Sequence, residues 1–440
     1  MSVELDFTVE KLGDCRIPSP IKLSKSSHDF MADYVSDDEC VLFDIVATAD
    51  RLKREFRPNE VLQRAGPREK IYFNPSKVHA GVVTCGGLCP GLNDVIRAIV
   101  MCLWYHYGVR RISGIRFGLR GLLPAYQLPA MELSPDVVSE IHHHGGTLLG
   151  SSRGGGERIS EIVDEIERMN LNMLFIIGGD GSQKGALAIS REAETRGYKI
   201  AVVGIPKTID NDLSYIERSF GFDTAVAAAV RVVSGAHVEA HDAVNGVGVV
   251  KLMGRESGFI AAHTALAIND VNFVLIPEVP FDLQGNNGLL AHLKRRLVER
   301  NHAVIVVAEG AGQDHLAAAQ ERDASGNIRL GDIGVLIRDA IADYFKKESM
   351  EVNVKYIDPS YIIRSSAADP GDSLYCARLG TNAVHAAMSG KTRALVSLVN
   401  NHFVHVPIKM ATASRNSVDP ESSLWRDVVN ATGQPALMKN

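Results

Sequence analysis

Two aspartates close together, Asp210 and Asp212, are the residues of this sequence best suited to acid–base chemistry. They lie in the segment GIPKTIDNDL, which directly follows an apolar run and also contains Lys207 and Thr208. Two neighbouring carboxylates that face an anionic ligand disfavour each other's ionised forms, so one of them becomes more basic. A general base needs this property together with reach toward a hydroxyl. The alternative is a structural turn, which would need neither the lysine nor the second acid.

A glycine-rich segment, FIIGGDGSQKGA, predicts a phosphate-binding loop. An apolar run ends at Ile177, and residues 178–182 then lead into a helix-like stretch. Glycines let the backbone approach a phosphate, and a helix N-terminus supplies free N–H groups. Asp180, in the middle of the loop, is well placed to hold a magnesium ion that bridges phosphates. The alternative is a tight turn with a helix cap.

Three more loops follow apolar runs or small residues and carry glycine or arginine. TCGGLCPGLND repeats the strand–glycine–helix pattern at Gly86 and Gly87. GTLLGSSRGGGE adds Arg153, a cation that suits polyphosphate oxygens unless it lies on a plain surface loop. KLMGRESGF opens at Gly254 and offers Arg255 to a phosphoryl group or a sugar phosphate, the alternative being an ion pair with a nearby acid.

The elements that must position these loops alternate between short apolar runs and longer amphipathic ones. The strand-like runs are residues 81–85, 173–177, 200–205, 245–250, 273–276, 303–308 and 394–399. The helix-like stretches include residues 157–169, 224–239, 289–299 and 372–388. Runs this apolar are typical of strands buried on both faces, and the alternation favours parallel βαβ units. We therefore expect an α/β fold of two doubly wound, Rossmann-like lobes with parallel sheets and a cleft between them.

Composition narrows the class of protein. The 440 residues contain 47 Lys+Arg and 52 Asp+Glu, and the net charge of −5 gives no reason to expect a nucleic-acid or membrane partner. The acidic N-terminus does not look like a signal peptide, and no stretch approaches the roughly 20 apolar residues of a membrane span. The six cysteines are scattered, which is unlike a disulfide framework. We expect a cytoplasmic protein.

In combination and in this order, GGDGS, PKTIDND and MGRESG resemble the phosphofructokinase family over about residues 78–400. The resemblance implies nucleotide contacts at the following residues: Gly86, Arg153, Gly154, Gly179, Asp180, Gly181, Ser182 and Gly185. It implies substrate contacts at a second set: Thr208, Ile209, Asp210, Met253, Gly254, Arg255, Glu309, Lys355, Tyr361 and Arg364. It also gives catalytic roles to Asp210, Asp212 and Arg255, with Mg²⁺ at Asp180.

The activity implied by this resemblance is in-line transfer of a phosphoryl group from ATP to the 1-hydroxyl of fructose 6-phosphate. Asp210 would take the hydroxyl proton, while magnesium, Arg153 and Arg255 stabilise charge on the moving group. The implied domains are an extension (1–75), a nucleotide-binding lobe (76–221, completed by about 363–410), a sugar-phosphate-binding lobe (222–362) and a C-terminal segment (411–440). A homo-oligomer, dimer or tetramer, is also implied, with Lys355 a candidate to complete a neighbouring site.

The phosphoryl donor is the point on which the family pattern divides. Pyrophosphate-dependent relatives pair a lysine at the position of Lys207 with an aspartate at the position of Gly181. Here the lysine is present but the acid is not, so no carboxylate repels a nucleotide phosphate. This favours ATP. Pyrophosphate dependence, a lipid or nicotinamide-nucleotide kinase that shares only GGDGS, and a non-catalytic sugar-phosphate sensor are the competing hypotheses.

Several histidines and cysteines look like metal ligands but have simpler interpretations. Residues 142–144 form a histidine run at a helix end, and His237 and His241 lie in an Ala/Val-rich stretch typical of a packed helix. Cys85 and Cys89 lie in a glycine-rich turn without a second Cys/His pair nearby, so we interpret them as packing residues.

Overall fold

The computed structural model describes residues 5–26, 28–46, 56–316 and 329–440. The chain divides into two compact units, each made of several segments. The first unit consists of Met1–Thr208, Leu213–Gly221 and Ser366–Arg415, and the second of Ile209–Asp212, Phe222–Ser365 and Asn416–Asn440. The segment PKTIDND is therefore divided between the units. Its first three residues, up to Thr208, belong to the first unit, and the part with Asp210 and Asp212 belongs to the second.

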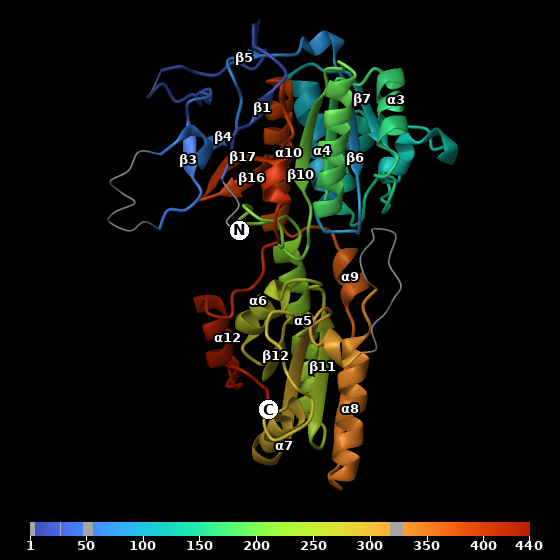
Figure 1. Ribbon diagram of the computed structural model, residues 1–440, viewed down its shortest axis with the longest axis vertical. Coiled ribbons are helices and arrows are strands. Elements are labelled where there is room, and N and C mark those ends of the chain that lie inside the picture. Colours follow the sequence, from blue (N-terminus) through green and yellow to red (C-terminus); the bar gives the residue numbers. More distant parts are fainter. Residues whose placement is uncertain (1–4, 27, 47–55, 317–328) are drawn as a thin grey trace. The chain divides into compact units, whose positions relative to one another are not determined.

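The first unit is built on a nine-stranded sheet (Figure 1). Its strand order is β3 (Cys40–Leu42), β4 (Val61–Arg64), β17 (His402–Pro407), β16 (Ala394–Val399), β10 (Ala201–Pro206), β9 (Met173–Gly178), β6 (His79–Thr84), β7 (Arg111–Ile115) and β8 (Met131–Glu132). The five strands from β16 to β7 are parallel, whereas β17, β4, β3 and β8 join antiparallel. The sheet is thus mixed rather than purely parallel.

Helices cover this sheet because its central strands are apolar on both faces. All six residues of β9 are buried. Leu174 and Ile176 pack with α3 (Ile159–Met169) and α4 (Asp180–Thr195) in one core cluster. The remaining helices of the unit are α1 (Leu92–Met101), α2 (Pro135–Val138), α10 (Pro370–Met388) and α11 (Ile408–Ala411). Helices α1 and α10 pack against each other, and α10 also contacts β10 and β16.

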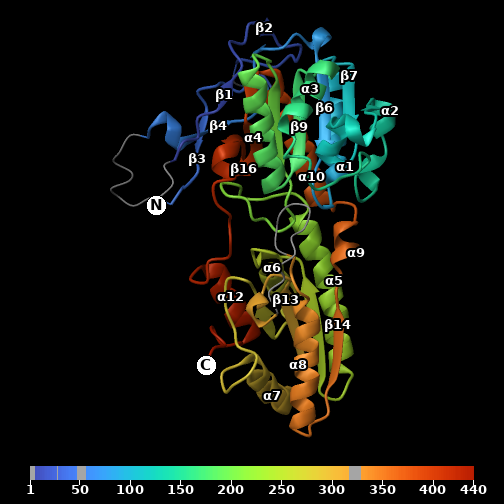
Figure 2. The same cartoon turned by 45° about the vertical axis from the view of Figure 1, so that its right-hand side comes forward.

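The second unit has a four-stranded sheet in which every pair is parallel. Its order is β12 (Phe273–Leu275), β13 (His302–Ala308), β11 (Gly246–Leu252) and β14 (Asn353–Ile357). The helices are α5 (Phe222–His241), α6 (Phe259–Ile268), α7 (Leu289–Arg300), α8 (Ile333–Lys347), α9 (Ser360–Arg364) and α12 (Ser423–Thr432) (Figure 2). Val250 and Val306 pack with α5, α6 and α12 on one face, while Val249 and Val307 pack with α7 and α8 on the other. The unit therefore has three layers.

The predicted α/β class with Rossmann-like lobes is confirmed, and all seven predicted strands are present. The antiparallel strands β17, β4 and β3 were not predicted as part of the sheet. Their partners lie far away in the sequence, as in the pairing of Val404 with Arg64. Local apolar patterns carry no information on such a pairing.

The described residues among the first 75 belong to the first unit, and their first two strands each form a two-stranded sheet. Strand β1 (Glu10–Lys11) pairs with β15 (Lys391–Thr392), and β2 (Ile17–Pro18) pairs with β5 (Lys70–Ile71). At the other end of the chain, residues 416–440 belong to the second unit, where Gln434 bonds the backbone of Val274.

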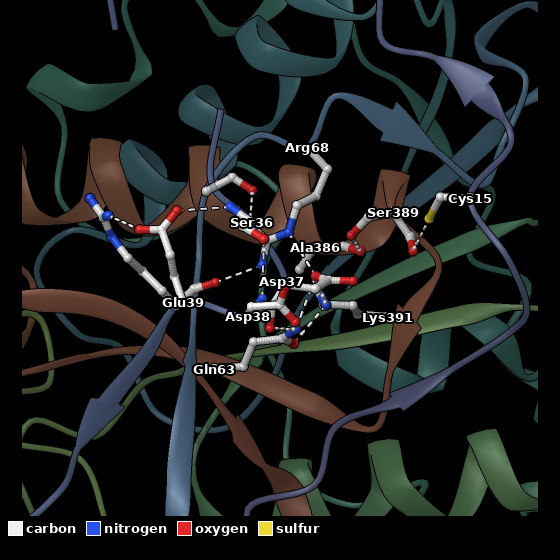
Figure 3. Close-up of polar contacts among 12 residues, drawn as sticks. Cys15, Ser36, Asp37, Asp38, Glu39, Gln63, Arg68, Ala386, Ser389 and Lys391 are labelled. Atoms are coloured by element: carbon white, nitrogen blue, oxygen red, sulfur yellow. Dashed lines mark hydrogen bonds and ion pairs between the residues drawn. The ribbon is translucent and has the colours of Figure 1, made fainter. Parts of the chain in front are cut away.

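An ion cluster centred on Asp37 ties the N-terminal segment to the strands of the first unit (Figure 3). The Asp37 carboxylate accepts hydrogen bonds from Lys11 at 2.5 Å, Arg68 at 2.8 Å and Lys391 at 3.1 Å. Lys391 also donates to Gln63 at 2.6 Å. The Lys391 side chain is only 1% exposed, so its charge depends on these partners.

Candidate active site

Asp180 lies at the start of α4, directly after the apolar strand β9. Gly179 is the N-cap residue, so the free N–H groups of the helix follow it. The Asp180 carboxylate is 21% exposed and accepts a hydrogen bond from Lys184 at 2.9 Å, one helical turn later. The local geometry is a strand, a glycine turn and a helix N-terminus with one accessible acid.

The glycines of this loop differ in what surrounds them. A Cβ atom at Gly179 would lie 3.2 Å from the backbone oxygen of Lys207, so a side chain there would crowd the neighbouring strand end. A Cβ atom at Gly181 would meet no heavy atom within 4 Å among the described residues, apart from its chain neighbours and the backbone of its own helix. At Gly185 the nearest atom would be Leu119 Cδ1 at 3.5 Å, an ordinary contact. Among these three glycines, Gly181 is therefore the one with open space around it.

Lys207 connects this loop with the glycine pair after β6. Its side chain is buried, and Nζ donates a hydrogen bond to the backbone oxygen of Gly87 at 2.9 Å. Gly86 has a positive φ of 89°, and its Cβ atom would lie 3.1 Å from Lys207 Nζ. The backbone N–H of Gly86 donates to Ser152 at 2.9 Å, and the Ser151 hydroxyl donates to Gly86 at 2.7 Å. These bonds bring the loop that carries Arg153 next to Gly86.

Arg153 is exposed, and Gly154 after it has a φ of 83°, which favours glycine. Ser182, in the first turn of α4, has its Cβ 2.5 Å from where a Cβ of Gly178 would lie, so Gly178 must lack a side chain. The structure thus gathers Gly86, Lys207 and residues 179–182 at the ends of β6, β9 and β10.

In the second unit, Asp210 lies beside the turn that follows β11. The backbone N–H of Arg255 points to Asp210 Oδ2 at 3.4 Å, and the Ser257 hydroxyl donates to the backbone oxygen of Asp210 at 3.0 Å. Ser257 is fully buried. The backbone of Asp210 is therefore held by a buried hydroxyl, while its carboxylate faces the start of MGRESG.

The turn after β11 is shaped by its contact with the turn after β13. Gly254 has a φ of 128°, and its backbone oxygen accepts a hydrogen bond from Gly310 at 3.0 Å. A Cβ atom at Gly310 would lie 1.8 Å from the backbone oxygen of Arg255, so the turns meet backbone to backbone. Met253 is buried beneath them.

Glu309 and Arg364 extend this charged group. Burial raises the pKa of Glu309, and the positive charges of Arg255, Arg364 and Lys251 oppose that rise. The Arg364 guanidinium stacks 5.0 Å from the ring centre of Tyr361. The predicted residues Asp210, Arg255, Glu309 and Arg364 therefore lie within the second unit as one group of mixed charge.

The side chains of Lys355 and Tyr361 are exposed to solvent. Lys355 is exposed on β14, the edge strand of its sheet, and Tyr361 is 79% exposed on α9. The predicted substrate roles of these two residues stay predictions, and neither side chain is enclosed by its own unit.

Thr208, Ile209 and Asp212 are held by contacts that the sequence did not indicate. The buried Ser219 hydroxyl donates to the backbone oxygen of Thr208, and Asn416 donates its backbone N–H to Asp212 at 2.9 Å. Ile209 packs against the α5–α6 core.

Sequence reasoning missed Lys251, which lies at the end of β11 between two acids. Its Nζ is 3.0 Å from both Asp332 and Asp358. Burial lowers the pKa of Lys251, but the hydrogen bonds to Asp358 and Asp332 outweigh it and raise this pKa overall. A lysine inside an apolar strand was the only available signal, because the two acids come from distant segments.

Metal-ligand candidates outside the loops do not form a site. In residues 5–26, 28–46, 56–316 and 329–440, no group of three His, Cys, Asp or Glu side chains is arranged to hold a metal ion. Cys85 and Cys89 are buried free thiols, and burial raises the pKa of Cys85 to about 12. No helix of the described chain combines the length and apolar character needed to cross a membrane.

The family model for phosphofructokinase matches residues 79–387. This chain belongs to the phosphofructokinase family. The ATP-dependent 6-phosphofructokinase of Borreliella burgdorferi is 55% identical, and the match covers 99% of this chain and 98% of that protein. The ATP-dependent 6-phosphofructokinase of Trypanosoma brucei brucei is 48% identical over 84% of this chain and 75% of its own length.

Solved phosphofructokinases share the fold at much lower identity. The pyrophosphate-dependent enzyme of Marinobacter aquaeolei superposes with a TM-score of 0.66 at 19% identity, over 81% of this chain and 91% of that one. The Pichia pastoris phosphofructokinase in the T-state gives 0.64 at 20% identity, over 81% of this chain and 37% of that one. Both likenesses concern the phosphofructokinase fold and leave the donor open.

Proposed function

We propose that this chain is an ATP-dependent 6-phosphofructokinase that converts fructose 6-phosphate to fructose 1,6-bisphosphate. The observation that carries the donor assignment is the space at Gly181, where a Cβ atom would meet no heavy atom of the described residues within 4 Å outside its chain neighbours and its own helix backbone. An acid at this position would place its charge in that space, whereas glycine leaves it for a nucleotide phosphate. The names of the relatives from Borreliella burgdorferi and Trypanosoma brucei brucei support ATP as well.

The proposed base is Asp210. Its carboxylate accepts the proton of the sugar 1-hydroxyl as that oxygen attacks the terminal phosphorus of ATP, and the bond to the bridging oxygen of ADP breaks. The nearby backbone N–H of Arg255 fixes the direction of the carboxylate. The guanidinium groups of Arg255 and Arg153 stabilise charge on the moving phosphoryl group, which is the main requirement of this chemistry.

Asp180 is the proposed metal-binding residue. A single partly exposed carboxylate at a helix N-terminus fits Mg²⁺, which keeps several waters and is bound by one or two carboxylates plus substrate phosphates. The bound ion would neutralise phosphate charge. Lys184, already paired with Asp180, would hold the carboxylate in place before the metal binds.

Fructose 6-phosphate is proposed to bind through the mixed-charge group of the second unit. Arg255 and Arg364 offer guanidinium groups to its phosphate, and Glu309 offers a carboxyl group to its hydroxyls. We propose a homo-oligomer, dimer or tetramer, in which Lys355 and Tyr361 complete the site of a neighbouring copy. Their exposure on β14 and α9 is consistent with contact to another chain.

A coupled assay of fructose 1,6-bisphosphate formation tests this function. The purified chain with Mg²⁺ and fructose 6-phosphate would receive ATP in one arm and pyrophosphate in the other. We expect turnover with ATP to exceed turnover with pyrophosphate clearly. Faster turnover with pyrophosphate would reverse the donor assignment, for which Lys207 is the residue to examine first. If neither donor gave product, the proposal that this chain is a phosphofructokinase enzyme would be overturned.

A further inference from the structure

Gln183 is a fully buried polar side chain beneath the loop at residues 179–182. It lies in the first turn of α4, and its backbone N–H donates to Gly179 at 3.0 Å. Its side-chain nitrogen lies 2.9 Å from the backbone oxygen of Gly178, 3.2 Å from that of Ile205 and 3.3 Å from that of Ile176. Three acceptors around one nitrogen require the donating NH₂ end of the amide to point there.

The three carbonyl groups belong to two neighbouring strands. Ile176 and Gly178 are at the end of β9, and Ile205 is at the end of β10, in parallel register with Ile177. Gly178 also accepts the backbone N–H of Lys207 at 3.1 Å, and a carbonyl oxygen has two lone pairs for both bonds. One side chain thus clamps the last residues of both strands together.

The packing around Gln183 indicates that this arrangement is specific. A Cβ atom at Gly204, on β10, would lie 2.1 Å from Gln183 Oε1 and 3.0 Å from its Cδ. Even alanine at position 204 would therefore displace the amide. Burying an amide costs free energy unless its hydrogen bonds are made. The NH₂ end of Gln183 has its acceptors, but Oε1 has no hydrogen-bond partner among the described residues. An apolar residue that only filled the space would avoid this cost, so the NH₂ contacts are the reason for a glutamine here.

The clamped strand ends lead directly into the two loops that the proposed function uses. After Gly178 come Gly179 and Asp180, and after Ile205 come Pro206 and Lys207, whose Nζ bonds Gly87. Because Gly179 and the Lys207 carbonyl are already close, a small shift between β9 and β10 would close or open the space beside Gly179.

We infer that Gln183 is a positioning residue that sets the spacing between the phosphate-donor loop at residues 179–182 and the Lys207 segment. This inference rests on the proposed function and adds a determinant of ATP affinity that lies beneath the loop. Gln183 is buried under the strand ends and acts through Gly178 and Ile205.

Gln183→Met is the test, since methionine is close in size and removes the donor. We expect the KM for ATP to rise about ten-fold or more, as misplacement of a positioning group commonly costs that much or more in rate. The KM for fructose 6-phosphate should change much less. Amide hydrogen exchange of Lys207, whose N–H is bonded to Gly178, should speed up locally. Gln183→Asn, one methylene shorter, is the second variant if methionine prevents folding.

Gln434→Met is a matched control. Gln434 is another buried glutamine that bonds strand backbone, donating to Val274 at 3.3 Å and accepting from it at 2.6 Å, but in the second unit. It should lower the Tm without a selective change in the KM for ATP. A Gln183→Met enzyme with a wild-type KM for ATP, or with equal increases for both substrates, would overturn the inference.

The failure of this inference and of the proposed function can be told apart. If wild type does not phosphorylate fructose 6-phosphate with ATP, the function is wrong. Calorimetric binding of Mg·ATP to wild type and Gln183→Met, together with the exchange rate at Lys207, then decides the role of Gln183 without catalysis. Unchanged binding and exchange would count against it.

Discussion

Asp210 is held by its neighbours at two points, one on its backbone and one on its carboxylate. Its backbone oxygen accepts the hydroxyl of the buried Ser257, and its Oδ2 lies 3.4 Å from the backbone N of Arg255. The first contact fixes the main chain and the second fixes the side chain. An acid held at both points loses little entropy when a hydroxyl approaches it.

Asp210→Ala should reduce kcat by about 10²–10⁴-fold, the usual contribution of a general base. Fructose 6-phosphate should still bind, as measured by calorimetry, because Arg255 and Arg364 remain. Asp242→Asn, at an acid that is 79% exposed in the same unit, should leave kcat unchanged. Retained turnover in Asp210→Ala would mean that another group accepts the proton.

Gly181→Asp should raise the KM for ATP. Two unit charges about 4 Å apart repel by about 4 kcal/mol at the effective dielectric of a protein surface, and the carboxylate would face a nucleotide phosphate. Gly181→Asn has nearly the same size without the charge and is the matched control. Equal KM values in the two variants would show that size rather than charge controls donor choice.

Among the elements, the short strands of the first 75 residues depend most on long-range ionic contacts. β1 has only two residues, and Lys11 within it reaches Asp37. Burial raises the pKa of Asp37, but Lys11, Lys391 and Arg68 outweigh it and hold this pKa well below its usual range. Burial and the charge of Arg68 lower the pKa of Lys391 to about 8, although Asp37 opposes this. Burial therefore changes the pKa of Lys391 more than the attraction of Asp37 does.

Asp37→Asn should lower the free energy of unfolding at pH 7 by about 2 kcal/mol, less than for a fully buried pair because Asp37 is 41% exposed. The difference from wild type should shrink as pH rises through 8, because Lys391 loses its proton in the folded state and its attraction to Asp37 disappears. Urea unfolding at pH 7 and pH 9.5 measures both values.

Proton linkage determines how Lys391 and Asp37 each change the free energy of unfolding with pH. Between pH 8 and the ordinary lysine pKa of 10.5, unfolded Lys391 binds more protons than folded Lys391, so its contribution makes the fold more stable as pH rises. Asp37 has a lowered folded pKa, so its stabilisation is present above the unfolded pKa of about 3.9 and is lost as pH falls through the folded pKa. A pH-independent effect of Asp37→Asn would contradict the coupling between Asp37 and Lys391.

At the scale of the whole molecule, α9 and β14 carry large side chains that their own unit does not enclose. Tyr361 and Ile362 are 79% and 72% exposed on α9, next to the exposed edge strand β14 with Lys355. Large exposed apolar side chains of this kind often mark contact surfaces. They are consistent with a neighbouring copy of the chain.

If Lys355 completes a neighbouring site, Lys355→Ala and Asp210→Ala subunits should complement each other. Each variant alone should have little activity, and hybrids refolded together should recover part of it, because one type of site then has both residues intact. Sedimentation should give a dimer or tetramer. A fully active monomer, or hybrids without any recovery, would remove Lys355 from the site.

The sequence by itself determined seven strands of the two sheets, the loops that follow them and the family. Apolar runs such as residues 173–177 gave β9 because burial on both faces leaves no polar position, and the Gly–Asp–Gly turn after it follows from local backbone freedom. These are short-range properties, so they can be predicted without tertiary contacts. The side chains that carry the proposed chemistry, Asp180, Asp210 and Arg255, were also found this way, since each lies in such a turn.

Only the tertiary structure decided which groups support those turns. The Asp332 and Asp358 partners of Lys251, the Gly204 space that admits Gln183, and the Asp37–Lys391 pair each join residues far apart in the chain. Their energies depend on burial and on distances of about 3 Å, which a sequence pattern does not encode. The loops could be predicted from local sequence, whereas the contacts that hold them required the fold.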